Sequence, residues 1–191
     1  MRELVYFVAV SLDGYIAAPD GSFGDFPIEG DHVDMILRDY TDTLPSHVLS
    51  ALALQPDNAR FDTVLMGWNT YAAGFPHGVR NPYPHLRQYV FSRSETEAAA
   101  DIVLTAEDPV AVVKELKAED SGADIWLCGG GQLAGALRGE LDRLILKVNP
   151  VLLGAGIPLF AGQDYMVRSA ELTSSTAFQS GVVVNEYRFE K

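Results

Sequence analysis

Apolar residues along the chain predict short buried strands separated by helices and loops. The run from residue 3 to residue 10 is β-rich and almost continuously apolar, which is typical of a central strand covered on both faces. Further strands are predicted at 63–67, 87–92, 101–104, 124–128 and 142–148, and two or three more between 150 and 189. Helical patterns cover 31–43, 45–54 and 108–119, and a short helix-compatible segment follows residue 131.

The order of these elements predicts the class of fold. Strands alternate with helices up to about residue 138, and this order favours parallel strands joined by crossover connections. After that point strands follow one another, which favours antiparallel pairing at one end of the sheet. We therefore predict an α/β fold with a mixed, mostly parallel sheet, formed by one domain over residues 1–191.

Composition narrows the partners that the protein can have. The net charge is −12, and no basic patch is visible that would attract nucleic acid or an anionic membrane. No signal-peptide pattern or membrane-length apolar run is present, so we expect a cytoplasmic protein. The only cysteine, Cys128, lies in an apolar run and is interpreted as a small buried side chain.

Glycines after the predicted strand at 124–128 suggest a phosphate site. Gly129, Gly130 and Gly131 would let the backbone approach a ligand closely, and a helix starting behind them favours an anion. The alternative is that these glycines only allow tight packing of helix on sheet. Two more strands end in polar residues, at 67–70 and 92–94, and carboxyl ends of parallel strands lie at one edge of a sheet. Because these three strand ends are expected to lie close together, they predict a binding site for a nucleotide.

A dinucleotide fingerprint of the Rossmann type was considered for the same stretch. Gly129, Gly131 and Ala134 fit its glycine spacing. That fingerprint, however, follows the first strand of its fold and is followed about twenty residues later by an acid for the ribose. Here the motif comes late and the corresponding positions are 149–151, so this interpretation fails on context.

Five motifs together resemble the dihydrofolate reductase superfamily. The branch most similar to the chain is that of the reductase domain of the bifunctional riboflavin-biosynthesis protein. The resemblance implies a three-layer α/β domain with a central sheet of about eight strands, NADPH as hydride donor, and often a homodimer. The motifs are Ser-Leu-Asp-Gly-Tyr-Ile-Ala at 11–17, Val-Leu-Met-Gly-x-x-Thr-Tyr at 64–71, Val-Phe-Ser-Arg at 90–93, Trp-Leu-Cys-Gly-Gly-Gly at 126–131 and Pro-Val-Leu-Leu-Gly-x-Gly-Ile-Pro-Leu-Phe at 150–160.

The resemblance also assigns cofactor contacts, one set to each strand end. Arg93 would read the 2′-phosphate, because a guanidinium pairs bidentately with phosphate; the alternative is a solvated surface arginine. The implied cofactor contacts are Ala9, Val10 and Ile16 beside the nicotinamide, Gly67, Trp68, Asn69 and Thr70 at the phosphates, Ser92, Arg93 and Ser94 at the adenosine ribose, and Gly129, Gly130, Gly131, Gln132 and Leu133 at the pyrophosphate.

Several positions depart from the family pattern. Trp68 stands where members usually carry a basic residue, so one charged phosphate contact is missing. The riboflavin reductases usually have Lys or Arg at the position of Tyr15 and Glu at that of Gly129, which argues against a phosphoribosylaminouracil substrate. Dihydrofolate reductase keeps an acid after its first loop; Asp31 or Asp34 could occupy that region, but folate is not assigned.

Asp13 is the best candidate for a catalytic or substrate-orienting group. A carboxyl in an apolar cleft would have a raised pKa and could relay a proton, although Asp-Gly is equally a common turn pair whose carboxylate caps its own backbone. Tyr71 could line the substrate side, or belong to the core. The four histidines lack metal-ligand spacing.

Together these features predict an NADPH-dependent reductase that passes hydride to a C=N or C=O bond of a small heterocycle such as a pterin, pyrimidine or flavin. The alternative function is a relative of the same fold that binds a nucleotide or metabolite without catalysis.

Overall fold

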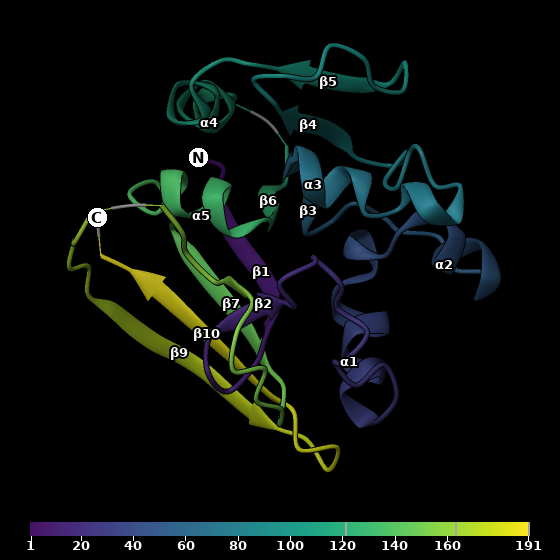
Figure 1. The fold of residues 1–191 in the computed structure, drawn as a ribbon, viewed down its shortest axis with the longest axis vertical. Coiled ribbons are helices and arrows are strands. Elements are labelled where there is room, and N and C mark those ends of the chain that lie inside the picture. The colour runs from purple at the N-terminus through teal and green to yellow at the C-terminus, as the bar shows by residue number, and fades with distance from the viewer. Residues whose placement is uncertain (121, 163, 191) are drawn as a thin grey trace.

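An eight-stranded sheet forms the centre of the computed structural model, which describes residues 1–120, 122–162 and 164–190. Its strand order is β5-β4-β3-β6-β1-β7-β10-β9 (Figure 1). The strands are β1 Leu4–Val10, β3 Phe61–Gly67, β4 Arg87–Phe91, β5 Ile102–Thr105, β6 Asp124–Gly129, β7 Arg143–Val148, β9 Ala170–Ala177 and β10 Val183–Phe189. A separate two-stranded sheet joins β2 (Tyr15–Ala17) to β8 (Ile157–Pro158).

Pairing directions agree with the predicted change along the chain. The strands from β5 to β7 in the sheet order are parallel, β10 is antiparallel to β7, and β9 is antiparallel to β10. This confirms the α/β fold with a mostly parallel sheet and an antiparallel C-terminal end. The carboxyl ends of β4, β3, β6 and β1 are neighbours, because these strands are adjacent in the sheet.

Alternate residues of each strand enter two different cores. On one face Val5, Phe7 and Trp126 join a cluster to which Met35 and Ile36 of α1 (Asp31–Asp39) contribute. On the other face Tyr6 and Leu127 pack with residues of α4 (Pro109–Ala118) and α5 (Gly131–Leu137). The sheet is therefore the middle of three layers, with α4 and α5 on the face opposite α1 (Figure 1).

Helix boundaries differ from the predicted ones where side chains are used elsewhere. The predicted helix over 31–43 ends at Asp39, because Tyr40 leaves helical geometry and stacks on Phe7 with ring centroids 4.2 Å apart. A 3₁₀ turn follows, η1 (Thr41–Thr43), in which buried Asp42 accepts hydrogen bonds from the N–H groups of Asn58, Arg60 and Phe61. The other short elements are α2 Ser46–Ala51, α3 Trp68–Ala72 and the 3₁₀ turn η2 Phe75–His77.

The start of α4 follows its sequence signal. Asp108 caps the helix by accepting from the N–H of Val110, and Pro109 is the first helical residue, as predicted. The short strands β2 and β8 were not predicted. Each is two or three residues long and pairs only with the other, so neither has a periodic pattern of its own.

Candidate functional site

The turns after β3 and β6 lie against each other. A Cβ added at Gly67 would lie 3.8 Å from the backbone nitrogen of Gly130, and one added at Gly130 would lie 3.3 Å from Oγ1 of Thr70. The structure therefore brings together two of the three strand ends that the sequence proposed as one site. Thr70 is the side chain of α3 that faces the glycines.

The three glycines after β6 do not have the same role. A Cβ at Gly131 would lie 2.2 Å from the carbonyl oxygen of Pro158, and the carbonyl of Gly131 accepts from the N–H of Ala161 at 2.9 Å. Tight packing thus explains Gly131. At Gly129, where φ is 137°, an added Cβ would meet only Thr70, at 3.8 Å. The Gly129–Gly130 peptide bond is cis. Close packing against a neighbouring backbone, as at Gly131, therefore does not account for Gly129, although this residue is also buried.

The turn after β4 presents an arginine to solvent. Gly67 pairs with Phe91, so residues 92–94 follow directly beside α3. The Ser92 hydroxyl accepts hydrogen bonds from the N–H groups of Ser94 and Glu95, which shapes this turn. Arg93 is exposed and forms no hydrogen bond or ion pair with any described residue. Its guanidinium is available to an anion.

Other residues of the predicted cofactor set differ in what they can offer. Asn69 and Gln132 are exposed, whereas Leu133 is buried in the core beneath α5 and can contribute only its backbone N–H. Trp68 is partly buried and packs edge-on against Tyr71 and Phe75, with centroids 5.4 and 5.9 Å away. An aromatic side chain thus stands where the family usually has a basic residue, and the guanidinium of Arg80 lies 4.0 Å from the centroid of the neighbouring Phe75 ring.

The end of β1 supplies the residues expected beside the nicotinamide. Ala9 and Ile16 are partly buried, and Val10 is buried with its carbonyl accepting hydrogen bonds from the backbone N–H of Asn149 at 2.8 Å and from its side-chain amide at 3.2 Å. These bonds fix β1 to the segment after β7. Their role toward a cofactor stays a prediction.

Tyr71 does not line an open cleft, contrary to the prediction of a substrate contact. Its side chain is 2% exposed, and its hydroxyl donates to the carbonyl of Arg80 at 2.8 Å and accepts from the N–H of Ala99 at 3.2 Å. Both functions of the hydroxyl are used within the fold. Tyr71 is a core residue that supports α3, which was the alternative interpretation.

Asp13 is exposed, and the expected raised pKa is wrong. A hydrogen bond from the Ser11 hydroxyl, at 2.6 Å, lowers the pKa of the Asp13 carboxyl, and the N–H groups of Gly154 and Leu153 act in the same direction. The carboxylate holds the loop after β1 against the loop after β7. This geometry favours the turn-capping interpretation, and a catalytic role for Asp13 stays a prediction.

The acids considered for a folate-like role lie outside the core that faces α1. Asp31 is exposed and accepts hydrogen bonds from the N–H groups of Gln179 and Ser180 in the β9–β10 turn, and these bonds lower its pKa. Asp34 is exposed as well. Within residues 1–120, 122–162 and 164–190, no group of three or more His, Cys, Asp or Glu side chains could hold a metal ion.

Sequence reasoning missed Lys147, a cation on the face of the sheet that packs against α1. It lies on β7 opposite Ala9, and its Nζ is 4.6 Å from the centroid of the Phe7 ring. Burial lowers the pKa of its ammonium to about 8. Strand alternation was the available signal, because Ile145 and Lys147 must share a face and Ile145 belongs to the core.

Comparison with known proteins identifies the family. The model of the RibD C-terminal domain matches residues 2–184. The chain belongs to this family. The uncharacterized protein YwjB of Bacillus subtilis is 33% identical over 165 residues, covering 83% of each chain.

Solved structures support the same fold. A candidate riboflavin biosynthesis protein from Shewanella sp. PV-4 superposes with a TM-score of 0.74 at 22% identity, over 100% of both chains. Dihydrofolate reductase from Enterococcus faecalis, complexed with NADP(H) and RAB-propyl, superposes with a TM-score of 0.63 at 14% identity, over 99% of this chain and 97% of that one. The dihydrofolate reductase-like fold that the resemblance implies is thereby confirmed.

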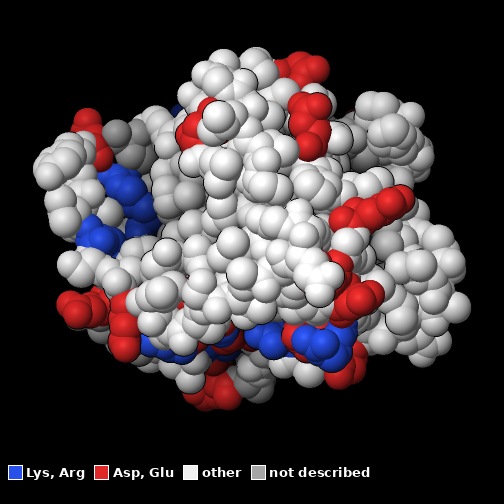
Figure 2. All heavy atoms as spheres, turned by 90° about the horizontal axis from the view of Figure 1, so that it is seen from below, with Lys and Arg blue, Asp and Glu red and all other residues white. Residues whose placement is uncertain are grey.

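The surface toward which β1 and β7 run has a distinct charge pattern. Figure 2 shows that charged side chains lie mainly at the margins of this face and that its centre carries few. The acidic excess of the chain is thus not concentrated around the ends of these strands. None of the described helices is both long and apolar enough to cross a membrane.

Proposed function

We propose that this protein is an NADPH-dependent reductase that transfers hydride to a C=N or C=O bond of a small heterocyclic substrate. One observation carries the proposal: the glycine turns after β3 and β6 lie so close that a Cβ added at Gly67 would be 3.8 Å from the backbone nitrogen of Gly130, in the row of strand ends that also includes Arg93, which is exposed and has no partner among the described residues. Backbone N–H groups at these turns, with a guanidinium at one end of the row, would be complementary to a phosphorylated dinucleotide. The family and the fold support the same assignment.

The residues fit this cofactor. A phosphate would bind beside the backbone of residues 129–131, near the first N–H groups of α5, and Arg93 would bind the 2′-phosphate. Ala9 and Ile16 would exclude water from the nicotinamide, which when bound supplies the hydride. Trp68 would contribute an aromatic surface instead of a charge.

Calorimetric titration with NADPH and NADH tests the cofactor assignment. We expect saturable binding of NADPH, at least about tenfold tighter than that of NADH, because only NADPH carries the phosphate that Arg93 would read. Quenching of Trp68 fluorescence should accompany binding and disappear in Trp68→Phe, which leaves Trp126 in the core. Absence of saturable binding by either nucleotide would contradict the proposal.

A non-catalytic binding protein is the second candidate function. It is favoured by Trp68, which removes a charged phosphate contact, and by Asp13, whose carboxylate is already held by the 153–154 backbone. Turnover separates the two functions. Oxidation of NADPH with any member of a panel of pterins, flavins and pyrimidines favours the reductase, and binding without oxidation across the panel favours the second candidate.

The homodimer that the resemblance implies would use the free edge of the sheet. All eight residues of β9 are exposed, and β9 pairs only with β10. We expect sedimentation to give twice the mass of the chain, and Thr173→Pro to give a monomer, because Pro on an edge strand prevents pairing. A wild-type monomer would contradict this arrangement.

A further inference from the structure

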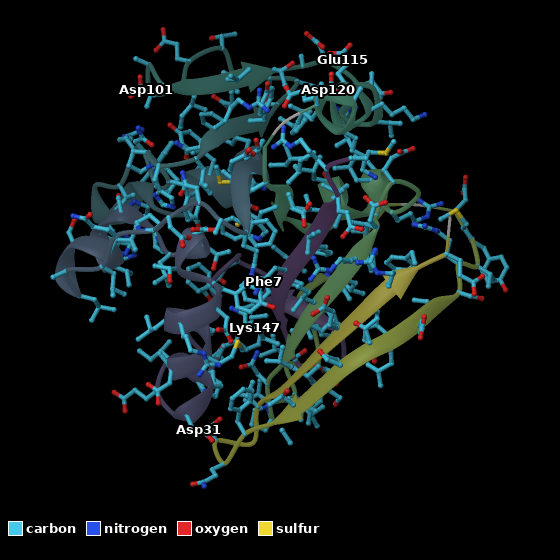
Figure 3. All side chains as sticks on the ribbon, turned by 180° about the vertical axis from the view of Figure 1, so that it is seen from behind. Phe7, Asp31, Asp101, Glu115, Asp120 and Lys147 are labelled. Carbon is cyan, nitrogen blue, oxygen red and sulfur yellow. The ribbon has the colours of Figure 1, made fainter. Side chains whose placement is uncertain are left out.

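Lys147 extends a row of apolar side chains toward the carboxyl end of the sheet. Its register partners are Ala9 on β1 and Val184 on β10, and Ile145, two residues earlier, lies in the core beneath α1. The backbone of Lys147 therefore lies beside Ala9, which is expected to border the nicotinamide. Figure 3 shows Phe7 and Lys147 together between the sheet and α1.

The ammonium is directed inward without a partner. Nζ lies 4.6 Å from the centroid of Phe7, a residue that is 3% exposed, and the ammonium of Lys147 forms no hydrogen bond or ion pair with any described residue. A lysine that serves only solubility extends its charged group into water. Here the chain keeps a charge against an aromatic core, where desolvation is unfavourable.

No carboxylate among the described residues is ion-paired with Lys147. Cys128 on β6 and Tyr83 are a thiol and a phenol, and burial raises the pKa of Cys128 to about 12 and that of Tyr83 well above its ordinary value. Glu186, on the same face of β10, accepts two hydrogen bonds from Arg143 at its Oε1, at 2.8 and 2.5 Å. On α1, buried His32 bonds to Ser180 and Pro27, and Tyr40 stacks on Phe7.

We propose that Lys147 is the proton donor of the proposed active site at the carboxyl ends of β1 and β7. Its ammonium contacts the acceptor atom of the substrate bond that is reduced. This rests on the proposed function. As hydride adds to the carbon of a C=O or C=N bond, the bond's electron pair moves to oxygen or nitrogen. Lys147 donates a proton to that atom, and the neutral amine then takes a proton from water.

The donor type also selects the substrate class. An ammonium has three donors and no acceptor, whereas a carboxylate can accept hydrogen bonds from an amino-substituted ring. In this cleft the described side chains offer a cation where a folate-like site would offer an acid. The substrate should therefore present a carbonyl oxygen, or a ring nitrogen with a lone pair, to Lys147, rather than the amidine edge of a pterin.

Isatin, a small heterocycle with two adjacent carbonyl groups, is the probe for this contact. Lys114, Lys117, Lys147 and Lys191 are the four lysines, so reductive ¹³C-methylation gives a simple spectrum in which Lys147→Met identifies one signal. We expect this signal to titrate near pH 8, below the ordinary 10.5 of a lysine, and to shift saturably with isatin. Lys147→Met should bind isatin at least about tenfold more weakly.

Two further variants separate proton donation from charge. Lys147→Arg keeps the charge but does not release a proton, so isatin binding should stay within about threefold while NADPH-dependent reduction falls on the order of 100-fold. Lys114→Met, which removes an exposed lysine of α4, should behave as wild type. Both Lys147 variants should bind NADPH as wild type does.

Two results would overturn the inference: an isatin response that leaves the Lys147 signal unmoved, or equal affinity of wild type and Lys147→Met for isatin. Full turnover by Lys147→Arg would remove the proton-donor role. Failure of NADPH to bind in calorimetry would instead remove the proposed function, and it is measured without isatin.

Discussion

The two ends of the parallel strands differ in whether their charged side chains are paired. Their amino ends form the amino edge of the sheet, and their carboxyl ends form the carboxyl edge. At the amino edge, Arg2, Arg87 and Arg143 form ion pairs with acids at the ends of neighbouring elements. At the carboxyl edge, Arg93 and Lys147 lack any such partner among the described residues. Paired charges hold strand ends together, whereas unpaired ones are available to a ligand.

A hollow of about 500 Å³ lies at the amino edge, lined by residues that include Arg38, Asp42, Arg60, Asp124 and Arg143. Asp42 accepts hydrogen bonds from three backbone N–H groups and Arg143 pairs with Glu186, so these charged side chains already have partners within the fold.

Removing Arg2 should have the largest effect on stability. Its guanidinium is buried, pairs with Asp62 and Glu119, and donates to Thr63 at 2.7 Å and to the carbonyl of Ala123 at 2.8 Å. Arg2→Met removes these four contacts, although Glu119 keeps its pair with Arg87, and we expect a loss of about 3 kcal/mol in the free energy of unfolding, measured with urea. A loss below about 1 kcal/mol would show that the network is dispensable.

A methyl group at Gly131 should disturb the carboxyl edge. The added Cβ would collide with the carbonyl of Pro158, so Gly131→Ala should cost about 2 kcal/mol of stability and weaken NADPH binding. Gly139→Ala is the matched control, because nothing lies within 4 Å of its Cβ. Calorimetry and urea unfolding should give wild-type values for the control; equal losses in the two variants would refute the packing argument.

Arg93→Met should separate the two nucleotides. We expect NADPH affinity to fall roughly tenfold, and NADH affinity to stay unchanged, because the lost bonds involve only the 2′-phosphate. Arg38→Met removes an arginine at the amino edge whose side chain is 70% exposed, and should alter neither affinity. Equal losses for both nucleotides in Arg93→Met would place the arginine at another phosphate.

Local patterns predicted the parallel strands well because each of them carries its own apolar run, and they predicted the start of α4 because the cap at Asp108 is formed by neighbouring residues. They predicted the site less well. The partners of Asp13 are 140 and 141 residues away, so an Asp-Gly pair alone could not show that its carboxylate is already bound. Lys147 could have been found by alternation along 143–148, but its isolation depends on Arg143 holding Glu186, a contact between strands.

Stability measured against pH tests the isolation of Lys147. The pKa of its ammonium is about 8 in the folded protein and ordinarily 10.5, so between these values the unfolded chain binds more protons at this site. Stability of wild type relative to Lys147→Met should therefore be lowest below pH 8 and rise as pH increases toward 10.5. A flat curve for Lys147→Met would mean that the ammonium is solvated, and that the carboxyl edge holds no buried cation.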